Sequence, residues 1–145
     1  MSMTLQGIKQ GVAITPVSLA SASATPLVID TAGYDELQIS VLASSVAATA
    51  EFSVLTLSSA DVTAATSFAT VSGYVGGTDF TIAETDGANP YVVQLNVDLR
   101  GKKRYFKVNL TTAATQLVGA TYSLGRAVAA PITASTAGVN TLVNP

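Results

Sequence analysis

Hydrophobic and polar residues alternate most regularly in two neighbouring stretches of the chain. From Tyr91 to Leu99 every odd position is apolar and the even positions, apart from Val92, are polar, and from Tyr105 to Thr111 positions 106, 108 and 110 are apolar. This period of two is typical of β-strands with one buried face. We therefore predict two strands, joined at Arg100-Gly101 in a β-hairpin, because glycine readily adopts the positive φ of a tight turn.

The register of this predicted hairpin follows from its two apolar sets. Both sets share one face only if an odd position lies opposite an even one, for example Leu95 opposite Phe106. The same register sets Asp98 opposite Lys103 as a pair of opposite charges. A shift by one residue would turn one apolar face into water, so this register is strongly preferred.

Shorter alternating or apolar stretches recur along the rest of the chain. They are residues 27–29, 37–41, 51–57, 68–75, 79–83 and 117–124. No long helical pattern interrupts them, and about eight strands at intervals of roughly ten residues indicate an all-β fold. We predict an antiparallel β-sandwich, similar to a jelly roll, with extended N- and C-terminal arms.

The two ends of the chain lack this regularity. Residues 1–25 end in a run of Ser, Ala and Thr, and they predict a loose arm, or a short edge strand from Val12 to Thr15, followed by a linker. The sandwich core is expected over residues 26–127 and a C-terminal arm over residues 128–145. That last segment is too apolar for a solvated tail, which suggests docking on a neighbouring subunit, with a disordered tail as the alternative. The candidate contact residues are Ile132, Val139, Leu142 and Val143.

Composition narrows the functional classes. Only 11% of the 145 residues are charged and 48% are hydrophobic, which suits a protein packed against other subunits. The chain has no Cys and no His, so disulfides, thiolate chemistry and His-based catalysis are excluded. We expect no enzymatic activity, no metal and no cofactor. The net charge of −2 gives no signature of nucleic-acid or membrane binding.

The sequence shows no recognisable targeting signal. The first residues lack a cationic flank followed by an apolar run, so no signal peptide is visible. No apolar stretch approaches the ~20 residues that span a bilayer. Synthesis in a cytoplasm is expected.

Five of the seven basic residues lie between Arg100 and Lys107. One interpretation is a solvated turn that protects a sheet edge from aggregation. The other is a docking point for an acidic protein surface, with Arg100, Lys102, Lys103 and Arg104 as contact residues. Nucleic acid fits less well, because the patch is small and Tyr105 is its single stacking candidate.

Two further groups of residues carry weaker signals. Asp79, Glu84 and Asp86 surround a loop that could bind Ca²⁺ or supply a catalytic pair, but their spacing fits no known calcium loop. Solvated turn residues are the simpler explanation. The five tyrosines could form a sugar-binding platform, although their spread favours core and interface packing.

Short motifs give the chain a resemblance to a family. Ile29-Asp30-Thr31-Ala32-Gly33-Tyr34, the stretch from Asp98 to Tyr105 and Leu124-Gly125-Arg126-Ala127 resemble segments of small structural proteins from tailed-bacteriophage heads. The likeness spans roughly residues 27–127. It implies a β-sandwich decoration or cement protein, commonly trimeric, on the outer surface of the capsid.

Residues and resemblance together predict a structural virion protein that stabilises a tailed-phage capsid by bridging major capsid protein subunits. A head-fibre base or a head–tail connector component is the alternative within this class. A carbohydrate-binding β-sandwich is the alternative outside it, and it would expose clustered aromatic residues on one face.

Overall fold

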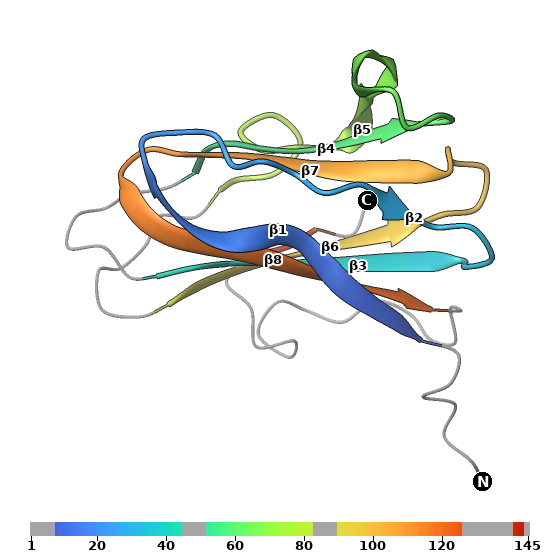
Figure 1. The fold of residues 1–145 in the computed structure, drawn as a ribbon, viewed down its shortest axis with the longest axis horizontal. Helices are drawn as coiled ribbons and strands as arrows, with labels where there is room; N and C mark the ends of the chain where they lie inside the picture. The colour runs from blue at the N-terminus through green and yellow to red at the C-terminus, as the bar shows by residue number, and fades with distance from the viewer. Residues whose placement is uncertain (1–7, 45–51, 83–89, 126–140, 144–145) are drawn as a thin grey trace, which may run out of the picture.

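The computed structural model describes residues 8–44, 52–82, 90–125 and 141–143. They form a sandwich of two β-sheets, with a single 3₁₀ turn, η2, at Ala65–Ser67 (Figure 1). The strands are β1 (Lys9–Ala20), β2 (Ile29–Asp30), β3 (Glu36–Ala43), β4 (Phe52–Ala60), β5 (Ala69–Val75), β6 (Tyr91–Asp98), β7 (Tyr105–Thr112), β8 (Thr115–Gly125) and β9 (Thr141–Val143).

The strand order is that of a jelly roll. Sheet A has the order β1-β8-β3-β6-β9, and sheet B has the order β2-β7-β4-β5. The first eight strands pair as a nested set, β1 with β8, β2 with β7, β3 with β6 and β4 with β5, all antiparallel. This nesting defines the double-sheet jelly roll. The prediction of an all-β, jelly-roll-like sandwich is thus confirmed.

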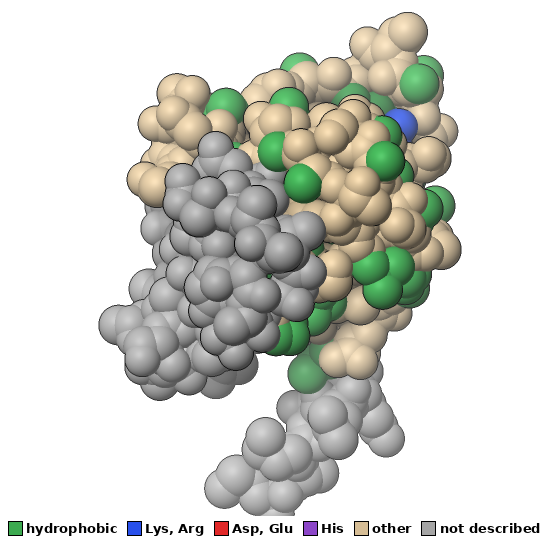
Figure 2. Space-filling model, turned by 90° about the vertical axis from the view of Figure 1, so that its left-hand side faces the viewer, with side chains coloured by type: hydrophobic (Ala, Val, Ile, Leu, Met, Phe, Trp, Pro, Cys, Tyr) green, Lys and Arg blue, Asp and Glu red, His purple; other side chains and the backbone are tan. Residues whose placement is uncertain are grey.

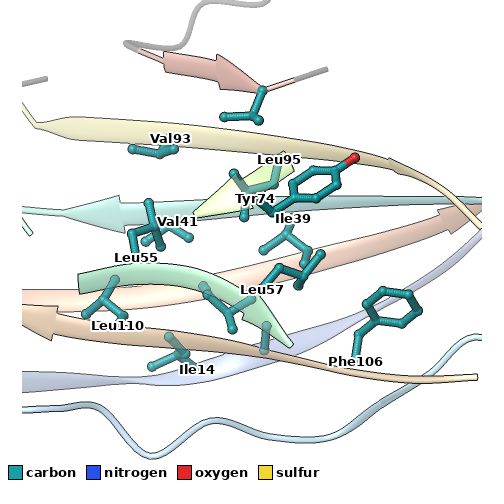
Figure 3. Packing of buried hydrophobic residues seen from close by; sticks show 14 of the residues in the cluster. Ile14, Ile39, Val41, Leu55, Leu57, Tyr74, Val93, Leu95, Phe106 and Leu110 are labelled. Carbon is teal, nitrogen blue, oxygen red and sulfur yellow. The ribbon is translucent and has the colours of Figure 1, made fainter. Parts of the chain in front are cut away.

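The core lies between the inward faces of the two sheets (Figure 3). Sheet A contributes alternating residues such as Ile39 and Leu95, and sheet B contributes residues such as Leu57 and Phe106, all fully buried. Phe52 and Tyr91 meet edge to face across the interior, with ring centroids 5.4 Å apart. One continuous apolar cluster therefore joins both sheets.

The predicted hairpin does not form. Both strands exist nearly as expected, but β6 lies in sheet A and β7 lies in sheet B. Leu95 pairs with Ile39, and Phe106 pairs with Ile29 and Ser59. Alternation of apolar and polar residues shows which face of a strand is buried, but it does not show which strand lies beside it. Two strands in facing sheets have the same pattern as two strands paired in one sheet. The pairing of Leu95 with Phe106 was therefore wrong.

The connection between these strands, residues 99–104, crosses from one sheet to the other, and we call it the β6–β7 loop. The amide of Lys102 donates to the carbonyl of Leu99 at 3.0 Å, closing a β-turn. Gly101 has a φ of 73°, which a side chain would strain, so the predicted role of this glycine in a turn is confirmed.

The N-terminal segment is more regular than its sequence suggests. β1 pairs with β8 from Lys9 opposite Leu124 to Ala20 opposite Thr115, and it forms an edge of sheet A. The expected loose arm over residues 1–25 was thus wrong for residues 9–20, and the predicted edge strand is longer than expected. Two register shifts, between 12 and 17, break the alternation that would have indicated a long strand.

Near the other end of the chain, β9 adds to sheet A beside β6. It pairs in parallel over three positions, Val93 with Thr141, Gln94 with Leu142 and Leu95 with Val143. Val143 is buried, at 5% exposure, in the core of its own sandwich. In this structure Val143 thus packs into its own sandwich, and Ile132 and Val139 lie outside the described residues. The predicted docking of the C-terminal residues on a neighbour stays a prediction.

Candidate interaction surfaces

The β6–β7 loop brings together the four basic residues that the sequence singled out, but its arginines are paired within the chain. Arg100 binds the carboxylate of Asp98, with Nη2 2.7 Å from Oδ2. Arg104 binds Asp30 through two hydrogen bonds of 2.8 Å, linking the loop to β2. These bonds lower the pKa of Asp30 and that of Asp98 to about 2, so both carboxylates stay ionised at neutral pH.

Only the two lysines of this loop carry charge without a partner in the described residues. Lys102 and Lys103 are exposed, and neither takes part in an ion pair there. Two further carboxylates lie at the same end. The carbonyl of Asp35 accepts from the amide of Leu99, and Glu36 pairs with Asp98 across β3 and β6. The expected cationic tip is therefore almost balanced in charge.

The outer face of sheet A has a different character. Across β1, β8, β3 and β6 the outward positions carry Ser, Thr, Gln, Asn, Gly and apolar side chains. The only charged residues of these four strands are Lys9, Glu36 and Asp98, and all three lie at the end next to the β6–β7 loop. The rest of this described face has no charged side chain.

Large apolar side chains stand out of this uncharged face. Leu117 on β8 is 55% exposed, Leu42 on β3 is 44% exposed and Val12 on β1 is 44% exposed. Leu42 lies opposite Val92 on one side and Gly119 on the other, so apolar and small residues cross three strands. Single exposed apolar residues are common, but several on one uncharged sheet face indicate a contact surface.

The same trend continues at the end of the sandwich opposite the β6–β7 loop. Figure 2 shows hydrophobic side chains scattered over the described part of this end, with charged side chains nearly absent. The charge of the described residues is thus concentrated at one end of the molecule and on sheet B.

The outer face of sheet B is mostly polar, with Val54 as an exposed apolar residue, and several of its polar groups bind each other. The ammonium of Lys107 lies over the ring of Phe68 at 4.2 Å, and the guanidinium of Arg104 lies over Tyr105 at 5.0 Å. The amide of Asn109 donates to the hydroxyls of Thr56 and Ser58 on β4. Because these groups are already paired, this face has less to gain from a partner than the face of sheet A.

The aromatic residues differ in how far they are exposed, and this bears on the predicted alternative of a sugar-binding platform. All nine belong to the described residues, and none is fully exposed. Phe52, Tyr74, Tyr91 and Phe106 are buried. Phe68 and Tyr105 are partly exposed, but each has a cation over its ring. A sugar that stacks on an aromatic ring would have to displace these cations.

Asp79 has a structural role in the loop after β5. Its Oδ2 accepts the amides of Gly73 and Val75, both at 2.9 Å, which closes the turn. A cleft of about 390 Å³ lies beside this loop, between Phe52 and Ile82. Glu84 and Asp86 lie outside the described residues, and the described ranges contain no cluster of acidic groups that could hold a metal. This supports the simpler explanation for Asp79, a turn residue.

Sequence reasoning missed the outer face of sheet A, although a signal was present. The polar positions of the predicted strands 37–41 and 117–124 hold only Gln, Ser, Gly and Thr. A solvated strand face usually carries Lys or Glu at some of these positions. The absence of Lys and Glu from these positions, in two strands that prove to be neighbours, could have indicated a covered face.

Comparisons with known proteins leave the family open. No protein-family profile matches the chain, and no curated protein is significantly similar to it. In the described part of the chain, no helix is long and apolar enough to cross a bilayer.

Proposed function

We propose that this chain is a structural virion protein that decorates and cements the head of a tailed phage. It binds the outer capsid surface through the outer face of sheet A and bridges neighbouring major capsid protein subunits. The observation that carries this proposal is the uncharged outer face with exposed Val12, Leu42 and Leu117. The short phage-head motifs in the sequence give independent support.

The size of this face suits a subunit that works in many copies. Four strands spaced by roughly 4.8 Å and eight residues long give a face of roughly 500 Å². That is below the roughly 800 Å² per partner of a standard stable interface. A single copy would therefore bind weakly, and simultaneous engagement of several linked sites would supply the remaining affinity.

The fold agrees with this proposal without deciding it. Jelly rolls occur in viral capsid proteins and also in lectins and cupins, so the surface must decide between these classes. A lectin would use exposed aromatic rings, and this chain has none that is fully exposed. A cupin-like enzyme would need His ligands, and the chain has no His. A head-fibre base or connector component remains the second candidate of the same class.

The β6–β7 loop has a secondary role in this proposal. Lys102 and Lys103 are the cations available to an acidic capsid surface, since Arg100 and Arg104 are held by Asp98 and Asp30. Such charges at the rim of an interface affect the association rate and orientation more than the affinity.

Mass spectrometry and electron cryomicroscopy of purified phage heads test the proposal. The protein should be present in lattice copy number on the outside of the head, with sheet A facing the capsid. Its absence from heads, or its presence only at the tail vertex, would contradict the decoration role.

A further inference from the structure

We propose that β9 is exchanged between copies of this protein, so that Thr141–Val143 of one copy pairs with β6 of another. The partner is thus a second copy of this chain. The inference rests on the proposed function and deepens it, because an exchanged strand would link neighbouring subunits on the capsid. Its test uses the isolated protein and needs no capsid.

The receiving site is the edge of sheet A at β6. Val93 and Leu95 point into the core and are fully buried, and their strand would form the sheet edge without β9. β9 covers this edge by parallel pairing, and Val143 fills the adjoining part of the core at 5% exposure. An uncovered edge of this kind is a ready template for a strand from another chain.

The donated element is small and self-contained. It pairs through three residues, and fifteen residues, 126–140, separate it from Gly125, the last described residue before it. A connection of this length can extend over roughly 50 Å. A domain of this size has a radius of gyration of roughly 15 Å, so the connection can reach β6 of an adjacent copy.

Exchange changes no contact, because each β6 edge receives an identical β9. The ratio of exchanged to unexchanged β9 then depends on the concentration of the protein. Because β9 is tethered to the same chain, its effective concentration at its own β6 is in the millimolar range. Dilute protein should keep β9 on its own β6, whereas copies crowded on a lattice should exchange it at low cost.

Introduced cysteines can distinguish the two arrangements, because the natural chain has no Cys. Gln94 and Leu142 lie opposite each other in the register of β6 and β9. The double variant Gln94→Cys/Leu142→Cys should form an intramolecular disulfide at micromolar protein concentration. A double variant that stays reduced would show that β9 does not pair with β6, and would overturn the inference.

The decisive arm mixes the two single variants, one carrying a tag that changes its mass. A chain with Gln94→Cys and a chain with Leu142→Cys can form a register-matched disulfide only in trans. At a protein concentration of about 1 mM, near the effective concentration, covalent heterodimers should exceed the homodimers that each variant forms alone by roughly fivefold or more. Heterodimers at or below the homodimer level would overturn the inference, while binding of the natural protein to heads would still support the proposed function.

Discussion

Individual side chains of this protein divide into those that hold the sandwich together and those that face a partner. Phe106 belongs to the first group. It is fully buried and lies between Ile29 on β2 and Ser59 on β4. Lys103, three residues earlier, is exposed and makes no ion pair in the described residues.

Phe106→Ala should lower the free energy of unfolding by about 3–5 kcal/mol, because it leaves a cavity between the sheets. Lys103→Ala is the control and should change the free energy of unfolding by less than about 0.5 kcal/mol. Urea titration followed by circular dichroism measures both. A loss below about 1 kcal/mol for Phe106→Ala would contradict the core described here.

Tyr74 gives the structure a sensitivity to alkaline pH. Its hydroxyl donates to the carbonyl of Asn96, and burial, together with the nearby Asp98, raises the pKa of Tyr74 to about 12. An unfolded tyrosine ionises near pH 10. The stabilisation is therefore complete below about pH 10 and is lost as the pH rises towards 12.

Tyr74→Phe should cost about 1 kcal/mol at neutral pH, because the hydrogen bond is lost. The free energy of unfolding of this variant should then fall less steeply above pH 10 than that of the natural protein. Denaturant titrations at several pH values between 8 and 12 provide the comparison. Parallel pH profiles of the two proteins would show that Tyr74 does not titrate as described.

At the scale of elements, alternation in the sequence predicted most strands and missed their partners. The stretches 91–99 and 105–111 were recognised because every second residue is buried, and this burial requires only that each strand has one inward face. Which sheet a strand joins depends on contacts far away in the sequence, such as Leu95 with Ile39. The sequence therefore could not show that β6 and β7 lie in different sheets.

The candidate surfaces were predicted to a smaller extent. The basic residues 100–104 were located correctly on a turn, but their partner Asp30 lies on β2, seventy-four residues before Arg104. Sequence distance hides such a pair. β9 was missed because three residues give too short a pattern for a period of two.

The contribution of β9 can be measured by deletion. Removing residues 141–145 takes away the strand that covers β6 and the buried side chain of Val143. The sandwich should still fold, and its free energy of unfolding should fall by about 1–3 kcal/mol, the order expected for one buried valine. Deletion of residues 144–145 alone, which spares β9, is the matched control.

Circular dichroism and urea titration measure the fold and the stability of both truncations. Unchanged stability after removal of residues 141–145 would show that the strand contributes nothing to its own sandwich. Complete unfolding would show that the eight-stranded jelly roll is not stable without it.

On the scale of the whole molecule, the two outer faces differ in what they can gain from a partner. Sheet B presents charged and polar groups that already bind each other, such as Asp30 with Arg104 and Lys107 with Phe68. Sheet A presents an uncharged face with exposed leucines. Contact with a partner would remove water from these leucines without breaking an existing polar interaction. Burial of such surface is the main favourable contribution to association.

Binding to capsid shells tests this account most directly, using Leu42→Asp and Leu117→Asp. Val62→Asp is the matched control, because Val62 lies in the loop after β4 and its exposure of 54% matches the 55% of Leu117. All three changes add one carboxylate at an exposed apolar position, so none should unfold the protein. We expect the two sheet A variants to bind shells roughly tenfold or more weakly, a loss of about 1.4 kcal/mol, and Val62→Asp to bind like the natural protein. Unchanged binding of both sheet A variants, or equal weakening by Val62→Asp, would contradict the proposed docking face.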